Sequence, residues 1–538
     1  MPQMRFLTRH FFDRFFDKDS ISPGSDPSAG VIQTLSMLAV PGLMLTFWMK
    51  ISPYFFVSYS MIVMGFVMTL KWDSLFPDRR DYVILGSLPI RYGDLFLAKL
   101  RALFIFLAMF AISANVVPTL ASPIGRGGGP WWMNFVAFLS GVYGGALFMV
   151  AAFAALQGIL ITILPDRVFR RLSPIVQMGS IAILLTTFLI YPLIEASIAP
   201  LASRSSGVMH YFPIFWFFGL YQFLLPGGDP NPVYRALALD AVYGLLITII
   251  VCASTYAIAY KRHARSILEA QEIQGLGHGL RSRLSQQLDR TLLSHPVQHA
   301  CFRFIGGILS RSSKHQVFLA VYLGIGVSLA LTSALVVNPQ AEFPFAFAAN
   351  GMLALPLTLS FFVISGLRAT FNMPYELPAN WMFRTTAGYD SQHHVAATLK
   401  WVAVSGLLPL ALFVAAIEFA YWPWPEALYH LAFEAVISLI LVQVLFFSFR
   451  KVPFTCSYYP GKKNMAILAG VYLYGFTMYS SSMVALENRL LRSPSYAVAF
   501  IFAGVATVLA LARARRRQAA PLIYEEQSDA QLQGLELN

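Results

Sequence analysis

Long apolar segments separated by short polar ones dominate the pattern of this chain. A membrane-spanning helix needs about 20 mainly apolar residues, and twelve segments of the sequence meet that requirement. They lie near residues 31–49, 53–70, 100–121, 133–164, 174–196, 236–259, 316–337, 346–367, 398–420, 428–449, 464–484 and 494–512. The pattern therefore predicts an all-α polytopic membrane protein with about 12 transmembrane helices.

Composition agrees with that prediction, and the positions of the charges add an orientation. The chain is 57% hydrophobic and 12% charged, whereas soluble domains carry about 25% charged residues. Its net charge of +13 does not indicate a nucleic-acid partner, because most Lys and Arg residues flank apolar segments. If the N-terminus is cytoplasmic, the outer segments hold few basic residues, among them Lys50, Arg126, Arg204, Arg489 and Arg492. This asymmetry predicts that both termini are cytoplasmic.

The spacing of the apolar segments recurs along the chain. Each set of six consists of two spans, a cytoplasmic segment of roughly thirty residues, two spans, a short basic turn and two more spans. We expect two parallel six-helix halves, residues 1–262 and 316–513, joined by a cytoplasmic connector at 263–315 and followed by a tail at 514–538. The connector is expected to contain a cytoplasmic helix.

Two shorter amphipathic or apolar segments belong to the first half. Residues 1–20 set five phenylalanines among basic residues, a pattern typical of an interfacial helix before the first span. Residues 211–226 are apolar and aromatic but too short to cross a bilayer, so they predict a re-entrant or interfacial helix.

The two long cytoplasmic segments, 71–99 and 368–397, mix aromatic and charged residues in a way that a solvated connector does not need. One interpretation is an amphipathic strap that rests on lipid. The other is a docking element for a soluble partner, because aromatic and Arg anchors dominate protein interfaces. The candidate docking residues are Phe76, Pro77, Asp78, Arg79, Arg80, Tyr82, Leu88, Pro89, Arg91, Tyr375, Glu376, Trp381, Phe383 and Arg384.

Motifs for catalysis, metal binding or nucleotide binding are absent from the sequence. There is no GxxxxGK[ST] phosphate loop, no HExxH and no GxSxG, and the three cysteines lack metal-ligand spacing. We therefore expect a chain that is not an enzyme and that binds no metal or cofactor itself. Two intramembrane acids, Asp240 and Glu434, fall deep in predicted spans, while Glu418 lies near a span end. Such groups are either functional or hydrogen-bonded in helix packing.

The sequence LFPDRRDYVILGSLPIRYGDLFLAKL, residues 75–100, resembles the segment between spans two and three of ABC-2-type exporter permeases. Leu88–Pro89–Ile90 matches the turn of the coupling helix in that family, and Lys99 matches the lysine that leads the third helix. The resemblance implies a six-span unit with an amphipathic helix before span one and re-entrant helices between spans five and six. Residues 1–20 and 211–226 match these two features in position. It also implies that spans one, two and five of each half line the translocation path. It covers spans one to six, whereas spans seven to twelve share only the layout.

By this resemblance, we expect the permease subunit of an ATP-driven exporter in the bacterial inner membrane. A separate ABC ATPase subunit, carrying ATP and Mg, would dock on the coupling segments, and the exported substrate is not indicated. The alternative is a proton- or ion-coupled secondary transporter of 12 spans that uses Glu434 and Asp240.

Overall fold

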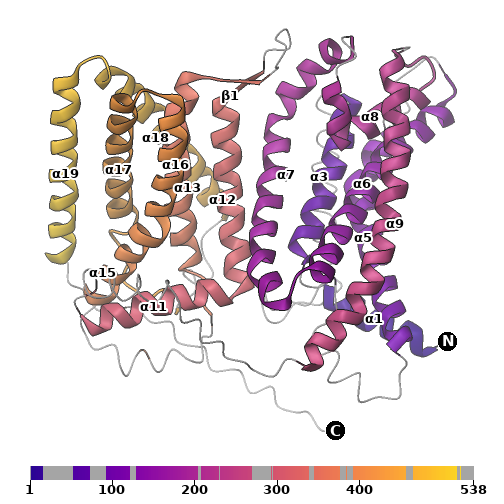
Figure 1. Ribbon diagram of the computed structural model, residues 1–538, viewed down its shortest axis with the longest axis horizontal. Coiled ribbons are helices and arrows are strands. Elements are labelled where there is room, and N and C mark those ends of the chain that lie inside the picture. Colours follow the sequence, from indigo (N-terminus) through magenta and orange to yellow (C-terminus); the bar gives the residue numbers. More distant parts are fainter. Residues whose placement is uncertain are drawn as a thin grey trace. The chain divides into compact units, whose positions relative to one another are not determined.

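The computed structural model describes residues 2–15, 52–72, 75, 92–121, 129–203, 207–229, 231–269, 293, 295–337, 345–375, 383, 392–455, 465–517 and 522. These residues form two compact units, which are described separately. Unit 1 contains helices α1 to α9, and unit 2 contains α11 to α19 (Figure 1).

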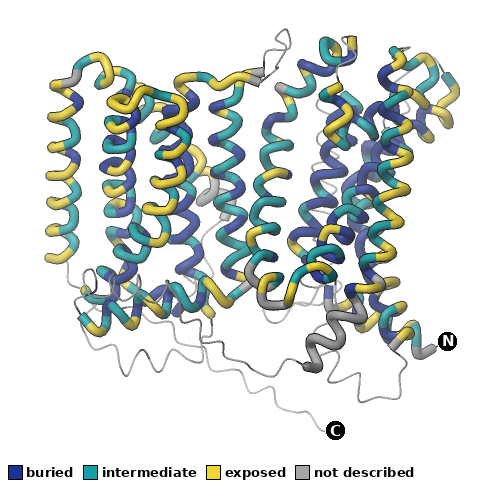
Figure 2. Tube along the Cα trace, in the orientation of Figure 1, coloured by how far each residue is buried: buried dark blue, intermediate teal, exposed yellow. Residues whose placement is uncertain are grey.

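Unit 1 is a helical bundle built around one central helix. Its elements are α1 (Pro2–Phe15), α3 (Pro53–Leu70), α5 (Tyr92–Ala121), α6 (Trp131–Ile163), α7 (Asp166–Ser203), the 3-10 helix η3 (Gly207–Tyr211), α8 (Pro213–Leu224) and α9 (Pro232–Glu269). Helix α3 begins at Pro53, whose missing N–H suits a first helical turn, and the Ser52 hydroxyl accepts from the Tyr54 N–H. Because α5, α6, α7 and α8 pack around α3, most of its residues are buried (Figure 2).

Unit 2 repeats this plan with a short sheet added. Its elements are α11 (Pro296–Arg311), α12 (Ser313–Ala334), β1 (Leu335–Val337), β2 (Phe345–Phe347), α13 (Ala349–Thr370), α15 (Gln392–Trp401), the π-helix η5 (Val402–Leu407), α16 (Leu408–Tyr421), α17 (Trp424–Leu445), α18 (Met465–Leu490) and α19 (Pro494–Arg517). Strands β1 and β2 pair with each other. Helix α11 belongs to the predicted connector, and its residues Cys301, Ile305 and Ile308 lie in the core of unit 2.

Ten helices of the described chain are long and apolar enough to cross a membrane. They correspond to ten of the twelve predicted segments. The segment 464–484 forms helix α18, which is not among the ten, and the segment 31–49 lies outside the described residues. The protein is thus an all-α polytopic membrane protein, and the count of twelve spans stays a prediction.

The second span of each predicted half ends in the same local structure. In α3, 78% of the span is buried, and in α13 83% is buried. The Thr69 hydroxyl donates to the Gly65 carbonyl at 2.8 Å, and the Thr370 hydroxyl donates to the Gly366 carbonyl at 2.7 Å. Both glycines lie where a side chain of another helix approaches, Leu184 at Gly65 and Tyr322 at Gly366. The last turn of the central helix is therefore built alike in both units.

Both short elements predicted in unit 1 are helical. Helix α1 buries Leu7, Phe11 and Phe15, spaced four residues apart, and exposes Phe6, as an amphipathic helix does. The segment 211–226 forms the end of η3 and the short apolar helix α8, which packs on α6 and α9.

Candidate functional site

Segments 71–99 and 368–397 are called the first and second coupling segments, after the role expected of them. Most of the predicted docking residues of the first coupling segment lie outside the described residues, namely Phe76, Pro77, Asp78, Arg79, Arg80, Tyr82, Leu88, Pro89 and Arg91. The structure describes how the segment begins, at Lys71, Trp72 and Leu75, and how it ends in α5. Both described ends contact neighbouring helices of unit 1.

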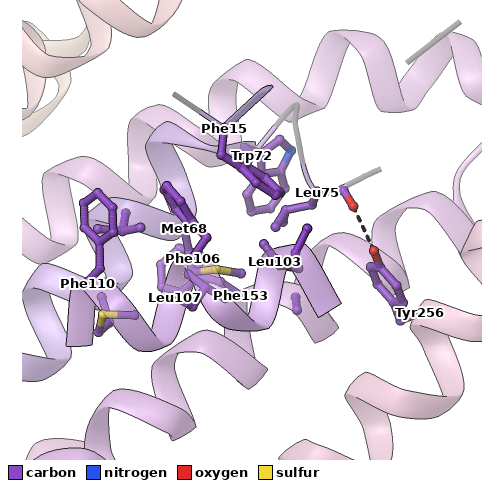
Figure 3. Packing of buried hydrophobic residues seen from close by; sticks show 14 of the residues in the cluster. Phe15, Met68, Trp72, Leu75, Leu103, Phe106, Leu107, Phe110, Phe153 and Tyr256 are labelled. Atoms are coloured by element: carbon purple, nitrogen blue, oxygen red, sulfur yellow. Dashed lines mark hydrogen bonds between the residues drawn. The ribbon is translucent and has the colours of Figure 1, made fainter. Parts of the chain in front are cut away.

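Two buried hydrogen bonds attach the start of the first coupling segment to unit 1. Gln157 of α6 donates from Nε2 to the Trp72 carbonyl at 2.8 Å. The Tyr256 hydroxyl of α9 donates to the Leu75 carbonyl at 2.8 Å, as the dashed line in Figure 3 marks. The side chains of Trp72 and Leu75 are 1% and 0% exposed and lie in the same apolar cluster as Phe106 and Phe153. A displacement of the segment must therefore act on α6 and α9.

Helix α1 covers this attachment. The Lys99 ammonium lies 5.1 Å from the centroid of the Phe11 ring and 5.2 Å from that of Phe15, which is cation–π geometry. Lys71, at the C-cap of α3, donates from Nζ to the Phe15 carbonyl at 2.6 Å. Burial lowers the pKa of the Lys71 side chain. Lys99, which the sequence resemblance singled out, thus holds the N-terminal helix against α5.

The second coupling segment, 368–397, is described at its start, around Phe383 and at its end. Glu376, Trp381 and Arg384 lie outside the described residues. The Tyr375 N–H donates to the Phe454 carbonyl, and the Phe454 N–H donates to the Phe371 carbonyl, both at 3.0 Å. The Phe383 ring meets the Phe304 ring of α11 edge-on, with centroids 5.0 Å apart.

Phe454 adopts a backbone conformation that costs free energy. Its φ is 66°, a left-handed value that a bulky residue rarely adopts and that costs about 1–3 kcal/mol. Its buried ring packs edge-on against Phe371 and His315, with centroids 5.4 Å and 5.0 Å away. His315 of α12 also holds the segment, because its Nε2 lies 3.1 Å from the Met373 carbonyl oxygen.

The two coupling segments are held at equivalent positions. Trp72 follows Thr69 by three residues, and Met373 follows Thr370 by three residues. In each case the backbone carbonyl meets a polar side chain from a neighbouring helix, Gln157 in unit 1 and His315 in unit 2. This equivalence was not visible in the sequence, where the two segments share few residue identities.

A cleft of about 710 Å³ lies within unit 2. It is lined by α12, α13 and α18, through hydroxyl and amide side chains together with small and apolar ones. The polar residues are Thr332, Ser333, Asn350, Thr358, Thr477, Ser480, Ser481 and Asn488. Asn488 donates from Nδ2 to Asn350 Oδ1 at 3.2 Å, which joins α18 to the start of α13. None of the residues that line the cleft is charged.

The two predicted intramembrane acids have different surroundings. The Asp240 side chain is 37% exposed and pairs with the His210 imidazole of η3. The Asp240 carboxyl is therefore not deeply buried. It lies near the start of α9, where this helix contacts η3. Glu434 is 3% exposed and belongs to unit 2. Each acid has a histidine near it, since Asp240 pairs with His210 and His430 lies near Glu434.

Glu434 lies in a buried cluster whose members come from three helices. Glu418 of α16, His430 of α17 and Glu487 of α18 are 2%, 1% and 0% exposed. His430 Nδ1 and Glu487 Oε1 form a hydrogen bond, and His430 Nε2 lies 3.2 Å from Glu418 Oε1. His430 and Glu434, four residues apart on α17, share one helix face. That spacing is the sequence signal that could have located this cluster.

The chemistry available to the described residues is limited. Among them, no group of three or more His, Cys, Asp or Glu residues has the arrangement to hold a metal ion. No family model matches the chain, and neither a curated protein nor a solved structure matches it. The candidate functional elements are the two anchored segments 71–99 and 368–397, the cleft of unit 2 and the acidic cluster of unit 2.

Proposed function

We propose that this chain is the permease subunit of an ATP-driven exporter, energised by a separate ABC ATPase that docks on the two coupling segments. The observation that carries the proposal is the cleft of unit 2, because α12, α13 and α18 line it. In the predicted second half these helices are spans one, two and five. They are the helices that the resemblance to ABC-2 permeases expects along the translocation path.

The attachment of the coupling segments supports the same function. A docking element transmits a partner's movement only if it is fixed to the helices that must move. The first segment is fixed through Trp72 and Leu75 to α6 and α9, and the second through Met373 to α12. Both segments also continue directly from the buried central helices α3 and α13. Force applied to either segment would therefore reach the core of its unit.

The arrangement in unit 1 adds two features that the resemblance implies. Helix α1 precedes the first predicted span and packs on α5, and the short apolar helix α8 lies between α7 and α9. An unidentified exported molecule would enter the substrate path.

Charge reversal in the first coupling segment tests this proposal. The double variant Arg79→Glu/Arg80→Glu should lose copurification with its ATPase, or lose stimulation of that ATPase, because interfacial arginines frequently dominate binding energy. The matched control is Arg235→Glu/Arg492→Glu, which reverses two exposed arginines at helix ends remote in sequence from both coupling segments. Full copurification and full stimulation in the Arg79/Arg80 variant would contradict the docking role.

The ion-coupled carrier is the second candidate, and the positions of its two acids give it less support. Asp240 lies in unit 1 and pairs with His210, while Glu434 lies in unit 2. If the protein were such a carrier, Asp240→Asn and Glu434→Gln would each abolish transport. Under the proposed function, Asp240→Asn leaves ATP-driven transport unchanged.

A further inference from the structure

Four ionisable side chains gather where α16, α17 and α18 approach one another in unit 2. Glu418, His430, Glu434 and Glu487 are each at most 3% exposed. A buried charge costs several kcal/mol unless it is paired and hydrogen-bonded. Three carboxyl groups and one imidazole at one buried place are therefore not explained by packing alone.

The charges of this cluster do not balance if every group is ionised. One imidazolium neutralises one carboxylate, so three carboxylates would leave two uncompensated negative charges in the core. Among the residues that the structure describes, Tyr429 and Tyr479 are in electrostatic contact with the cluster, and neither is a cation. The side chains that α13 and α19 contribute next to it include Leu357 and Phe500, which are apolar. Protons held by the carboxyl groups are the simplest compensation.

Unpartnered atoms point into the same cluster. Glu434 Oε2 has no hydrogen-bond partner among the described residues, and neither has Ser438 Oγ, whose side chain is 3% exposed. Ser438 follows Glu434 by one helical turn and shares its face. The outer oxygens of Glu418 and Glu487, both Oε2, also lack a partner in the described chain. The cluster thus has acceptor capacity that only a proton or another small donor can fill.

The imidazole geometry favours a proton over a metal ion. Both ring nitrogens of His430 face carboxylates, Nδ1 toward Glu487 and Nε2 toward Glu418. A metal ligand must present a nitrogen lone pair to the metal, but Nδ1 is already in a hydrogen bond with Glu487, and Nε2 faces Glu418 without forming a hydrogen bond. The ring thus lies between carboxyl groups of α16 and α18.

We propose that Glu418, His430, Glu434 and Glu487 form a proton-binding site that takes up and releases at least one proton at near-neutral pH. The site lies close to the connection between α16 and α17, since Trp422 of that connection meets His430 edge-on with ring centroids 5.2 Å apart. Proton binding changes the charge that links α17 to α18 through Glu487. It does not require the ATPase, so this proposal can fail while the proposed function holds.

Trp422 provides a spectroscopic test, because protonated imidazole quenches the fluorescence of a neighbouring indole. The purified full chain is titrated from about pH 8 to about pH 5, the range in which histidine ordinarily changes its charge. The emission of Trp422 is obtained as the difference between the wild type and Trp422→Phe. We expect this difference signal to fall with pH in a single step. The step should disappear when the same difference is taken between His430→Gln and the double variant His430→Gln/Trp422→Phe.

Direct proton uptake over the same pH range gives the second measurement. Glu434→Gln and Glu487→Gln should each take up fewer protons than the wild type, by up to one. The matched control is Glu426→Gln, because Glu426 lies exposed on the same helix, outside the cluster, so its replacement should leave proton uptake by the cluster unchanged. If the Trp422 signal does not change with pH, and if Glu434→Gln and Glu487→Gln take up as many protons as the wild type, the cluster is not a proton-binding site. Should a variant fail to fold, the wild-type and Trp422→Phe titrations still decide.

Discussion

Removal of one hydroxyl tests whether the start of the first coupling segment is fixed to unit 1. Tyr256→Phe deletes the donor that the Leu75 carbonyl accepts from at 2.8 Å and keeps the aromatic ring. The ring itself packs 5.8 Å from Phe96, centroid to centroid, and that contact survives the change. The variant therefore isolates the hydrogen bond.

The expected size of the effect follows from the burial of both partners. Tyr256 is 6% exposed and Leu75 is 0% exposed, so water does not replace the lost hydrogen bond. Leaving a buried acceptor unsatisfied costs about 1–3 kcal/mol. We take about 1–2 kcal/mol for a single neutral bond, which corresponds to a roughly 5- to 30-fold increase in local opening.

Hydrogen–deuterium exchange measures that opening. The amide of Leu75, which donates to the Trp72 carbonyl, should exchange about 5 to 30 times faster in Tyr256→Phe, with amides in the middle of α3 unchanged. Tyr243→Phe is the control, because Tyr243 lies on the same helix and is 61% exposed. A change below about twofold, or an equal change in both variants, would refute the anchoring role.

Two further predictions concern the packing of each unit. Gly219→Ala should lower the midpoint of thermal unfolding, because a Cβ at this position would lie 2.5 Å from Leu237 Cβ and overpacking costs about 1–3 kcal/mol. The control is Gly207→Ala, which should leave the midpoint unchanged, because nothing lies within 4 Å of a Cβ there. Cys301 should react slowly with maleimide, because burial raises the pKa of its thiol to about 12. Its thiolate fraction at neutral pH is then on the order of 10³ times below that of an exposed cysteine. The rate should rise with pH up to that pKa, as peptide mapping can follow, and a new cysteine at the exposed Ser310 should react at the ordinary rate.

The sequence predicted the helices well because burial in lipid demands long apolar runs. The segment 53–70 matches α3 at both ends, and 133–164 matches α6 within two residues. Helices α7 and α9 are much longer than predicted, 38 residues each. Their ends are polar, so hydropathy predicted that each helix ends where its apolar segment ends. Backbone hydrogen bonding continues both helices beyond these points.

Hydropathy alone did not place Glu487 in a helix that reaches the acidic cluster, for a related reason. Hydropathy ended the eleventh apolar segment at residue 484, since Glu487, Asn488 and Arg489 are polar. Helix α18 nevertheless continues to Leu490, because pairing with His430 lets the Glu487 carboxyl lie in the core. The surroundings of Asp240 could not be predicted from the sequence either. His210 is thirty residues away in the chain, and only tertiary structure brings the two side chains together.

Helix α18 is the element through which the cleft and the acidic cluster can influence each other. Ser480, Ser481 and Asn488 line the cleft, while Tyr479 and Glu487 of the same helix meet the cluster. Helix α18 packs on α13 and makes only limited contact with α19, and the His430–Glu487 hydrogen bond links it to α17. Proton release from that bond would therefore remove one support of a helix that lines the cleft, so a change of pH at the cluster would also be felt at the cleft.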